Sequence, residues 1–180
     1  TDRLDCVMEW YMGPYLFVVT QQNTAKVRVN MVYYNNPNVL YSGMETLPNG
    51  KPCIARMTNN ITEFSRRNEL LLEILRRCVQ PHQSHLLALS DRREHLRYLH
   101  DTIVERQIAS TGYYVGGMKQ SALQETETKQ IVLATYAMAA EALDIKTLST
   151  LVMVTPKTDI VQSVVRILRV KHENPSIVDI

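Results

Sequence analysis

IVLATYAMAAEALDIKTLSTLVMV, residues 131–154, is the stretch of sequence that decides the fold expected for this chain. It opens on the apolar run Ile131 to Ala134 and closes on a second run, Leu151 to Val154. Such continuous runs are typical of strands that are buried on both faces of a parallel sheet. The residues from about Ala139 to Leu143 suit a short helix, so the stretch predicts a strand, a crossover helix and a second parallel strand.

The same alternation extends to both sides of this stretch. Apolar runs at Leu86 to Leu89 and Tyr113 to Val115 predict two more strands, joined by an amphipathic helix from about Asp91 to Gln107. Asp91 and Glu94 are expected to cap that helix. Downstream, Asp159 to Val170 predicts a helix and Ser176 to Ile180 a strand that the end of the chain cuts off. Together these elements predict an α/β domain with a mostly parallel sheet and flanking helices.

The N-terminal part of the chain has a different pattern. Leu16 to Thr20 and Val27 to Tyr34 are rich in Val and Tyr and predict a β-hairpin. Residues 35–52 contain three prolines, two glycines and four asparagines, which predicts a long surface loop. We therefore expect an N-terminal segment over residues 1–57 and the α/β domain over residues 58–180.

A helix is expected at the start of the α/β domain. Apolar residues from Ile61 to Val79 recur at helical spacing, with Asn68 also on this stripe. Asn60 and Glu63 have the spacing of a capping box, which predicts that the helix begins at Ile61.

Composition excludes several classes of protein. Hydrophobic residues make up 45% and charged residues 21%, as in ordinary globular domains rather than disordered chains. The longest apolar runs are about six residues, far below the roughly 20 that span a bilayer, so no membrane partner is expected. The three cysteines form no CxxC pair, and His82 and His85 have no third ligand nearby, so no metal site is expected.

The charge is distributed unevenly along the chain. The net charge is only +2, but seven arginines fall in two short stretches. They form either a basic stripe for nucleic acid or the solvated faces of two helices. These residues are Arg66, Arg67, Arg76, Arg77, Arg92, Arg93 and Arg97.

Several stretches resemble the motifs of superfamily 2 helicases. Residues 134–145, ATYAMAAEALDI, resemble motif V, and residues 162–169, QSVVRILR, resemble motif VI. Upstream, residues 88–96, ALSDRREHL, resemble motif IV, and residues 115–117 the glycine turn after the next strand. The chain thus resembles the C-terminal, RecA-like half of such a helicase, which implies a doubly wound sheet. Residues 155–159, TPKTD, look most like the helicases of large DNA viruses, the poxvirus transcript-release and African swine fever virus group.

The resemblance implies roles for eight residues. Arg166 and Arg169 are expected to be catalytic, as arginine fingers toward ATP on the other half. Gln162 and Asp144 are expected to contact the nucleotide. Four residues at the carboxyl ends of strands, where parallel sheets bind ligands, are expected to approach the nucleic-acid backbone: Ser90, Arg92, Gly117 and Thr135.

Helical geometry gives independent support to part of this assignment. At about 100° per residue, Gln162, Arg166 and Arg169 lie within about 60° of one another, opposite the apolar arc of their helix. A solvated basic face near the helix end is the alternative interpretation. The sequence also departs from the family pattern, since Ala142 and Val165 stand where the motifs have glycine, and Val165 puts the position of Arg166 in question.

The sequence contains no GxxxxGK[ST] phosphate loop and no Asp-Glu motif for a metal ion. ATP and Mg²⁺ are therefore expected to bind mainly to a first RecA-like lobe of the same polypeptide, and this chain alone is expected to be inactive. The other expected partner is the backbone of DNA or RNA, and the expected state is an intracellular monomer in the host cytoplasm or virion. A non-catalytic nucleic-acid-binding or regulatory module is the alternative function. A small-molecule Rossmann enzyme is disfavoured because no GxGxxG follows the first strand.

Overall fold

The computed structural model describes residues 27–79, 85–141, 145, 147–158, 160 and 175–180. Within these residues the chain forms one six-stranded sheet, parallel throughout, in the order β1-β6-β5-β2-β4-β3. The strands are β1 (Arg28–Met31), β2 (His85–Leu89), β3 (Thr111–Tyr114), β4 (Ile131–Ala134), β5 (Leu148–Met153) and β6 (Ser176–Asp179). The helices are α2 (Val39–Ser42), α3 (Ile54–Glu63), α4 (Ser65–Val79), α5 (Arg93–Glu105), α6 (Gln120–Thr126) and α7 (Tyr136–Glu141).

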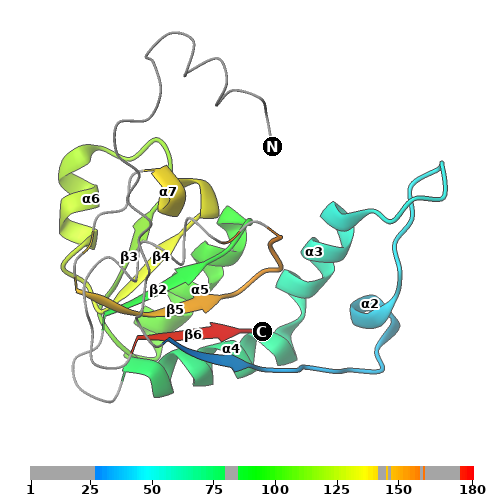
Figure 1. The fold of residues 1–180 in the computed structure, drawn as a ribbon, viewed down its shortest axis with the longest axis horizontal. Coiled ribbons are helices and arrows are strands. Elements are labelled where there is room, and N and C mark those ends of the chain that lie inside the picture. Colours follow the sequence, from blue (N-terminus) through cyan, green and yellow to red (C-terminus); the bar gives the residue numbers. More distant parts are fainter. Residues whose placement is uncertain (1–26, 80–84, 142–144, 146, 159, 161–174) are drawn as a thin grey trace, which may run out of the picture.

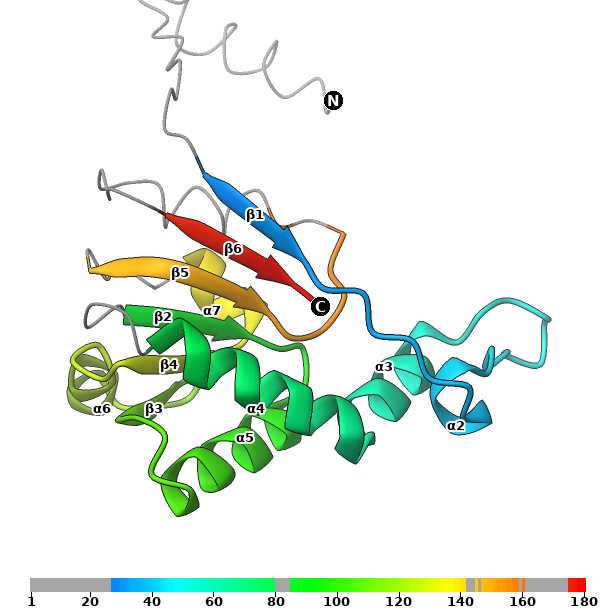
Figure 2. The same cartoon turned by 90° about the horizontal axis from the view of Figure 1, so that it is seen from below.

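Helices cover both faces of the sheet, α4 and α5 on one and α6 and α7 on the other (Figures 1 and 2). The strands alternate between the two cores that result. In β2, Leu86 and Ala88 pack in the cluster of α4 and α5, whereas Leu87 and Leu89 pack in the cluster of α6 and α7. The expected doubly wound, parallel α/β sheet is confirmed.

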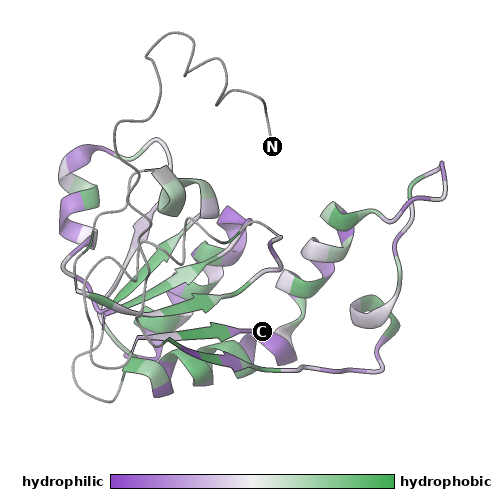
Figure 3. Ribbon diagram, in the orientation of Figure 1, coloured by the Kyte–Doolittle hydropathy of each residue, from purple (hydrophilic) through white to green (hydrophobic). Residues whose placement is uncertain are grey.

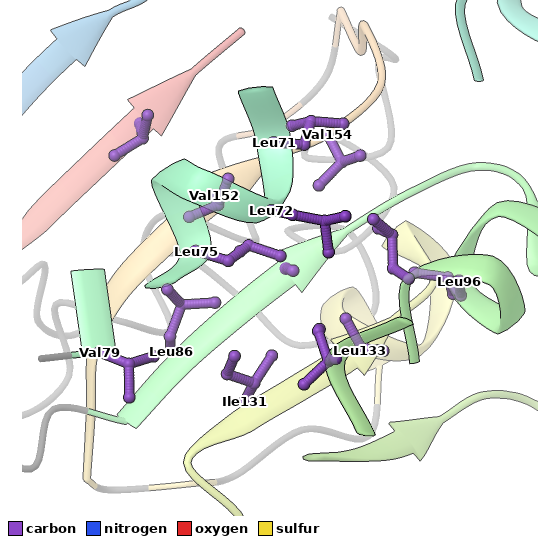
Figure 4. Packing of buried hydrophobic residues seen from close by; sticks show 14 residues of the cluster. Leu71, Leu72, Leu75, Val79, Leu86, Leu96, Ile131, Leu133, Val152 and Val154 are labelled. Carbon is purple, nitrogen blue, oxygen red and sulfur yellow. The ribbon is translucent and has the colours of Figure 1, made fainter. Parts of the chain in front are cut away.

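The apolar runs are buried because each strand has a packed layer on both sides. Figure 4 shows the cluster in which Leu71, Leu72 and Leu75 of α4 meet Leu86 and Val152 of the sheet. Hydropathy follows the same layering, since the central strands are hydrophobic while the helices carry hydrophilic residues (Figure 3).

The order of the strands puts the ends of three of them together. Strand β2 lies between β4 and β5. The chain runs from β2 through α5 to β3 at one edge, returns through α6 to β4, and then crosses β2 through α7 to reach β5. Because all strands are parallel, the loops that follow β2, β4 and β5 meet at one carboxyl edge.

The helix expected from Ile61 to Val79 is wrong at its start. The structure has two helices, α3 ending at Glu63 and α4 beginning at Ser65, with Phe64 between them in an extended conformation (φ −76°, ψ 103°). Phe64 packs against Tyr41 and Tyr34, with ring centroids 5.0 and 6.3 Å away. Asn60 lies inside α3, so it does not cap a helix.

The start of α5 also differs from the expectation. The helix begins at Arg93, and its N-cap is Arg92, whose side chain makes no capping hydrogen bond. Asp91 and Glu94 do not cap it, because the carboxylate of Asp91 faces Lys157 and that of Glu94 faces Arg97. Among the described residues, no side chain caps the first amides of α5.

Three other elements depart from the sequence prediction. The loop expected over residues 35–52 contains the short helix α2, and α6 was not anticipated. Of the expected hairpin, Leu16 to Thr20 lies outside the described residues. The second expected strand is β1, which pairs in parallel with β6.

Candidate functional site

The candidate site is the carboxyl edge of the sheet, where the loops after β2, β4 and β5 are joined by backbone hydrogen bonds. The amide of Ser90 donates to the carbonyl of Ala134 (3.1 Å), and the amide of Val154 donates to the carbonyl of Leu89 (2.9 Å). These bonds continue the pairing for one residue beyond the ends of β2 and β5. Consequently Ser90, Thr135 and Thr155 begin three neighbouring loops.

Two buried hydroxyls fix the loop after β2. The Thr155 hydroxyl accepts a hydrogen bond from the Asp91 amide (2.9 Å), and the Ser90 hydroxyl accepts one from the Arg92 amide (3.2 Å). Ser90 is 0% and Thr155 1% exposed. The side chain of Ser90 therefore holds the turn that presents Asp91 and Arg92, while Thr135 is partly exposed beside it.

A tyrosine and a lysine complete this edge. The buried Tyr136 donates its hydroxyl proton to the carbonyl of Thr155 (2.6 Å). Burial, and then the nearby charge of Asp91, raise the pKa of Tyr136, so its hydroxyl stays a donor at neutral pH. Lys157 lies 5.4 Å from the centre of the Tyr136 ring and 3.4 Å from the Asp91 carboxylate. One cation therefore already has an acidic partner at this edge.

Within the part of the chain that the structure describes, the two arginines at the start of α5 have no such partner. Arg92 donates from Nε to the side-chain carbonyl of Asn59 (2.6 Å) and from Nη2 to the carbonyl of Ala55 (3.1 Å). Arg93 donates from Nη2 to the carbonyl of Gly116 (3.1 Å). All three acceptors are neutral, and among the described residues no acidic group lies within 4 Å of either guanidinium. Two guanidiniums without an ion-pair partner among the described residues thus flank the start of a 13-residue helix whose N-cap side chain makes no hydrogen bond, an arrangement that suits an anion.

The loop after β3 adjoins this helix start. Gly116 is held by Arg93, and a Cβ there would lie 3.3 Å from the Arg93 guanidinium. Gly117 is exposed, with a left-handed backbone (φ +90°) that favours glycine. Of the residues predicted to approach nucleic acid, Ser90, Arg92 and Thr135 are therefore brought to one edge. Gly117 adjoins this edge because the preceding residue, Gly116, accepts a hydrogen bond from Arg93.

Four predicted site residues lie outside the described residues: Asp144, Gln162, Arg166 and Arg169. The helix predicted from Asp159 to Val170 lies there too, apart from Ile160.

The seven arginines do not form one basic stripe. Arg67 is 1% exposed and donates from Nη2 to the carbonyls of Val154 (2.7 Å) and Ile180 (2.9 Å). Arg76 and Arg77 both pair with Glu73. The stripe interpretation is therefore wrong, and the cationic feature is local to the start of α5.

Sequence reasoning missed a buried polar network beside this helix start. The Asn68 amide donates to the carbonyl of Thr62 (2.8 Å), so its oxygen is free to accept from Nε2 of His95 (3.0 Å). In the sequence, Asn68 falls on the apolar stripe of the expected helix and His95 within the motif IV stretch. Sequence spacing cannot predict the contact, because the two residues belong to different helices.

The described part of the chain holds no cluster of three His, Cys, Asp or Glu side chains that suits a metal ion. His82 lies outside the described residues, and His85 is in β2. No helix in the described ranges is long and apolar enough to cross a membrane.

Comparison with known proteins adds independent information. No protein-family model matches the chain. The whole chain aligns with a protein of Acanthamoeba polyphaga mimivirus, the "Putative ATP-dependent RNA helicase L396", at 36% identity over 187 residues. The chain spans 36% of the length of that relative.

Solved structures share the fold. The crystal structure of T4 UvsW superimposes with a TM-score of 0.67 at 18% identity, covering 85% of this chain and 32% of UvsW. Domain 2 of the DEAD-box helicase Mss116p, solved with an RNA duplex, gives a TM-score of 0.50 at 12% identity, covering 68% of this chain and 50% of that one. At these identities the likeness establishes the RecA-like fold, as the sequence resemblance implied.

Proposed function

We propose that this RecA-like helicase domain, related to that of the mimivirus protein, works as the second motor lobe of an ATP-dependent helicase or translocase. In this role it binds the backbone of a DNA or RNA strand along the carboxyl edge of its sheet. It also completes an ATP site whose main part lies on a first lobe. Cycles of ATP binding and release then change the backbone contacts and move the protein along the strand.

One observation carries the nucleic-acid part of the proposal. Arg92 and Arg93 present two guanidiniums that pair with no acidic side chain of the described residues, at the start of α5, where the N-cap side chain makes no hydrogen bond. Most contacts in such interfaces go to phosphates, from arginines and from helix N-termini. The loops of Gly117 and Thr135 extend the same edge, and the Ser90 hydroxyl positions the turn that carries Arg92.

The ATP part of the proposal rests on the sequence resemblance and on the likeness to the mimivirus protein. Arg166 and Arg169 would stabilise negative charge on the transferred phosphoryl group, as arginine fingers do. Gln162 and Asp144 would contact the nucleotide. Among the described residues no acidic cluster fits Mg²⁺, so the first lobe would hold the metal and the phosphates.

The proposed setting follows from the same relationship. The partners are the first RecA-like lobe of the same polypeptide and a nucleic-acid strand, and the protein acts as a monomer. A large DNA virus as source would place the protein in the host cytoplasm or the virion, where a role in transcription fits the resemblance.

The salt dependence of binding to a single-stranded oligonucleotide tests the nucleic-acid part. Log affinity should fall linearly with log salt, by about 0.7 per phosphate contact on a single strand. Arg92→Ala and Arg93→Ala should each weaken binding several-fold and lower the slope by roughly that amount. Arg77→Ala is the matched control, because it removes the same charge from an exposed site on α4. Equal binding by all three variants would contradict the proposal.

A further inference from the structure

A pocket opens beside the start of α5, and apolar atoms make up most of its surface although the residues that line it are polar. It has a volume of about 470 Å³, within the range of small-ligand pockets. Helix α3 contributes Asn59 and Thr62 and α4 contributes Ser65 and Asn68, while α5 contributes Arg92 to His95 and Tyr98. The pocket thus shares Arg92 and Arg93 with the edge at which we place the backbone of the strand.

The wall of this pocket contains a buried histidine. His95 is 4% exposed. The Asn68 oxygen accepts from Nε2 of His95, because the Asn68 amide group is committed to Thr62. The proton of the neutral ring is therefore on Nε2, and Nδ1 is a bare acceptor with no hydrogen-bond partner among the described residues. Burial, and then the charge of Arg67, lower the pKa of His95 to about 4, which keeps the ring neutral. Nδ1 is itself buried, so His95 gives the pocket a neutral wall that offers no cation to a bare phosphate.

The rim of the pocket favours a flat, uncharged group. Tyr98 lines the pocket and is 40% exposed, so its aromatic ring is available for stacking. Arg92 lines the pocket and donates hydrogen bonds to Asn59 and Ala55, which hold its guanidinium against α3. Glu63 and Glu94 also line the pocket, so their charges oppose those of Arg92 and Arg93. A planar, largely apolar group, attached to a phosphate that stays outside, fits this combination.

We propose that the pocket between α3, α4 and α5 receives one unpaired nucleobase of the bound strand, next to the phosphate held at the start of α5. The inference rests on the proposed nucleic-acid binding and adds to it a site that contacts a base. The lobe then grips one nucleotide by both its phosphate and its base. Stacking on an aromatic side chain tolerates every base, so the site requires no particular sequence.

The test compares two single strands of equal length, one normal and one with abasic sites in place of its bases. Both carry the same phosphates, so the difference between their affinities isolates the contribution of the bases. We expect the normal strand to bind about tenfold more tightly, within the range of one stacked base. Tyr98→Ala should remove that difference and leave the affinity for the abasic strand unchanged. Tyr33→Ala removes a tyrosine that is 87% exposed and lies outside the pocket, and it should change neither affinity.

A second variant keeps the test independent of Tyr98. Ser65 is exposed at the start of α4 and lines the pocket, so Ser65→Trp should fill the space and abolish the preference for the normal strand. Equal binding of normal and abasic strands by the unmodified protein would overturn the base site but leave the phosphate contacts standing. A preference for the normal strand that survives both Tyr98→Ala and Ser65→Trp would also overturn it. Failure to bind either strand would defeat the proposed function together with the pocket.

Discussion

Arg67→Met tests how the carboxyl edge is held together. Arg67 is 1% exposed, and its Nη2 bonds the carbonyls of Val154, just after β5, and Ile180, just after β6. Burial lowers the pKa of this guanidinium, and no acidic side chain pairs with it among the described residues. Its polar contacts are therefore the two carbonyls, with the Tyr41 hydroxyl also close by.

The magnitude follows from the groups that the substitution leaves unpaired. Methionine retains most of the volume of the side chain but makes neither bond. The buried carbonyl of Val154 then loses a charged donor, which costs about 1–3 kcal/mol, and the partly buried carbonyl of Ile180 adds about 0.5–1.5 kcal/mol. The substitution also removes the desolvation penalty of a buried cation that has no acidic partner in the described part of the chain, and this gain offsets part of the loss. We expect a net loss of about 1–3 kcal/mol in the free energy of unfolding, with Arg67→Ala losing about 2 kcal/mol more for the missing apolar atoms.

Urea unfolding followed by circular dichroism measures this loss. With a slope of about 2 kcal/mol per molar urea, the midpoint should fall by about 0.5–1.5 M. Arg66→Met is the matched control, since the neighbouring arginine is exposed and should change stability by less than about 0.5 kcal/mol. If Arg67→Met is as stable as the unmodified protein, the two carbonyl bonds do not hold this edge and the reasoning is refuted.

Two further predictions concern stability. The pKa of His95 is lowered from 6.5 to about 4 in the folded protein, so the unfolded chain binds more protons between these values. Stability should therefore fall as pH drops from 6.5 toward 4, by at most about 1.4 kcal/mol per pH unit from this residue. Urea unfolding at several pH values should show this slope, and a slope unchanged in His95→Leu would contradict the assignment. A Cβ on Gly112 would lie 2.8 Å from the Thr126 hydroxyl oxygen, so Gly112→Ala should cost about 1–3 kcal/mol. Thermal unfolding should show that Thr126→Ala in the same chain recovers much of this loss, and an unchanged loss would exclude the clash as its cause.

The sheet could be predicted from the sequence because its signal is local. The run Ile131 to Ala134 is β4 to the residue, and β2 and β5 cover the other runs with small shifts at their ends. Burial on both faces requires every residue of such a strand to be apolar, so the pattern is visible without knowledge of the neighbours. The loops that begin at Ser90 and Thr135 could be predicted as well, because they start where the apolar runs of β2 and β4 end.

The remaining features depend on partners far away in the sequence. Arg66 and Arg67 look alike in the sequence, but Arg67 is buried because carbonyls 87 and 113 residues away accept its hydrogen bonds. Phe64 interrupts a helical pattern because its ring packs against Tyr34 and Tyr41. Helix α6 has only two buried residues, too few for a periodic signal.

The candidate site was predicted only in part for the same reason. The motif-like residues Ser90 and Thr135 could be placed at one edge from the strand pattern alone. The pocket beside α5 could not, because it depends on how α3, α4 and α5 approach one another. Arg93 was not among the predicted site residues. It belongs to the site because its hydrogen bond to the Gly116 carbonyl ties the start of α5 to the loop after β3.

ATP hydrolysis stimulated by a single strand tests the central claim most directly. It should be measured in the polypeptide that also carries a first RecA-like lobe, with Arg169→Ala and Arg166→Ala beside the control Arg77→Ala. Arginine fingers contribute about 10³ to 10⁵ to turnover, so we predict that Arg169→Ala reduces the stimulated rate at least about tenfold, and Arg166→Ala by less because of Val165. Strand binding without nucleotide should stay nearly unchanged, and this chain alone should not hydrolyse ATP. Normal hydrolysis by both variants together with loss of strand binding would contradict the account, since these arginines would then contact nucleic acid rather than ATP.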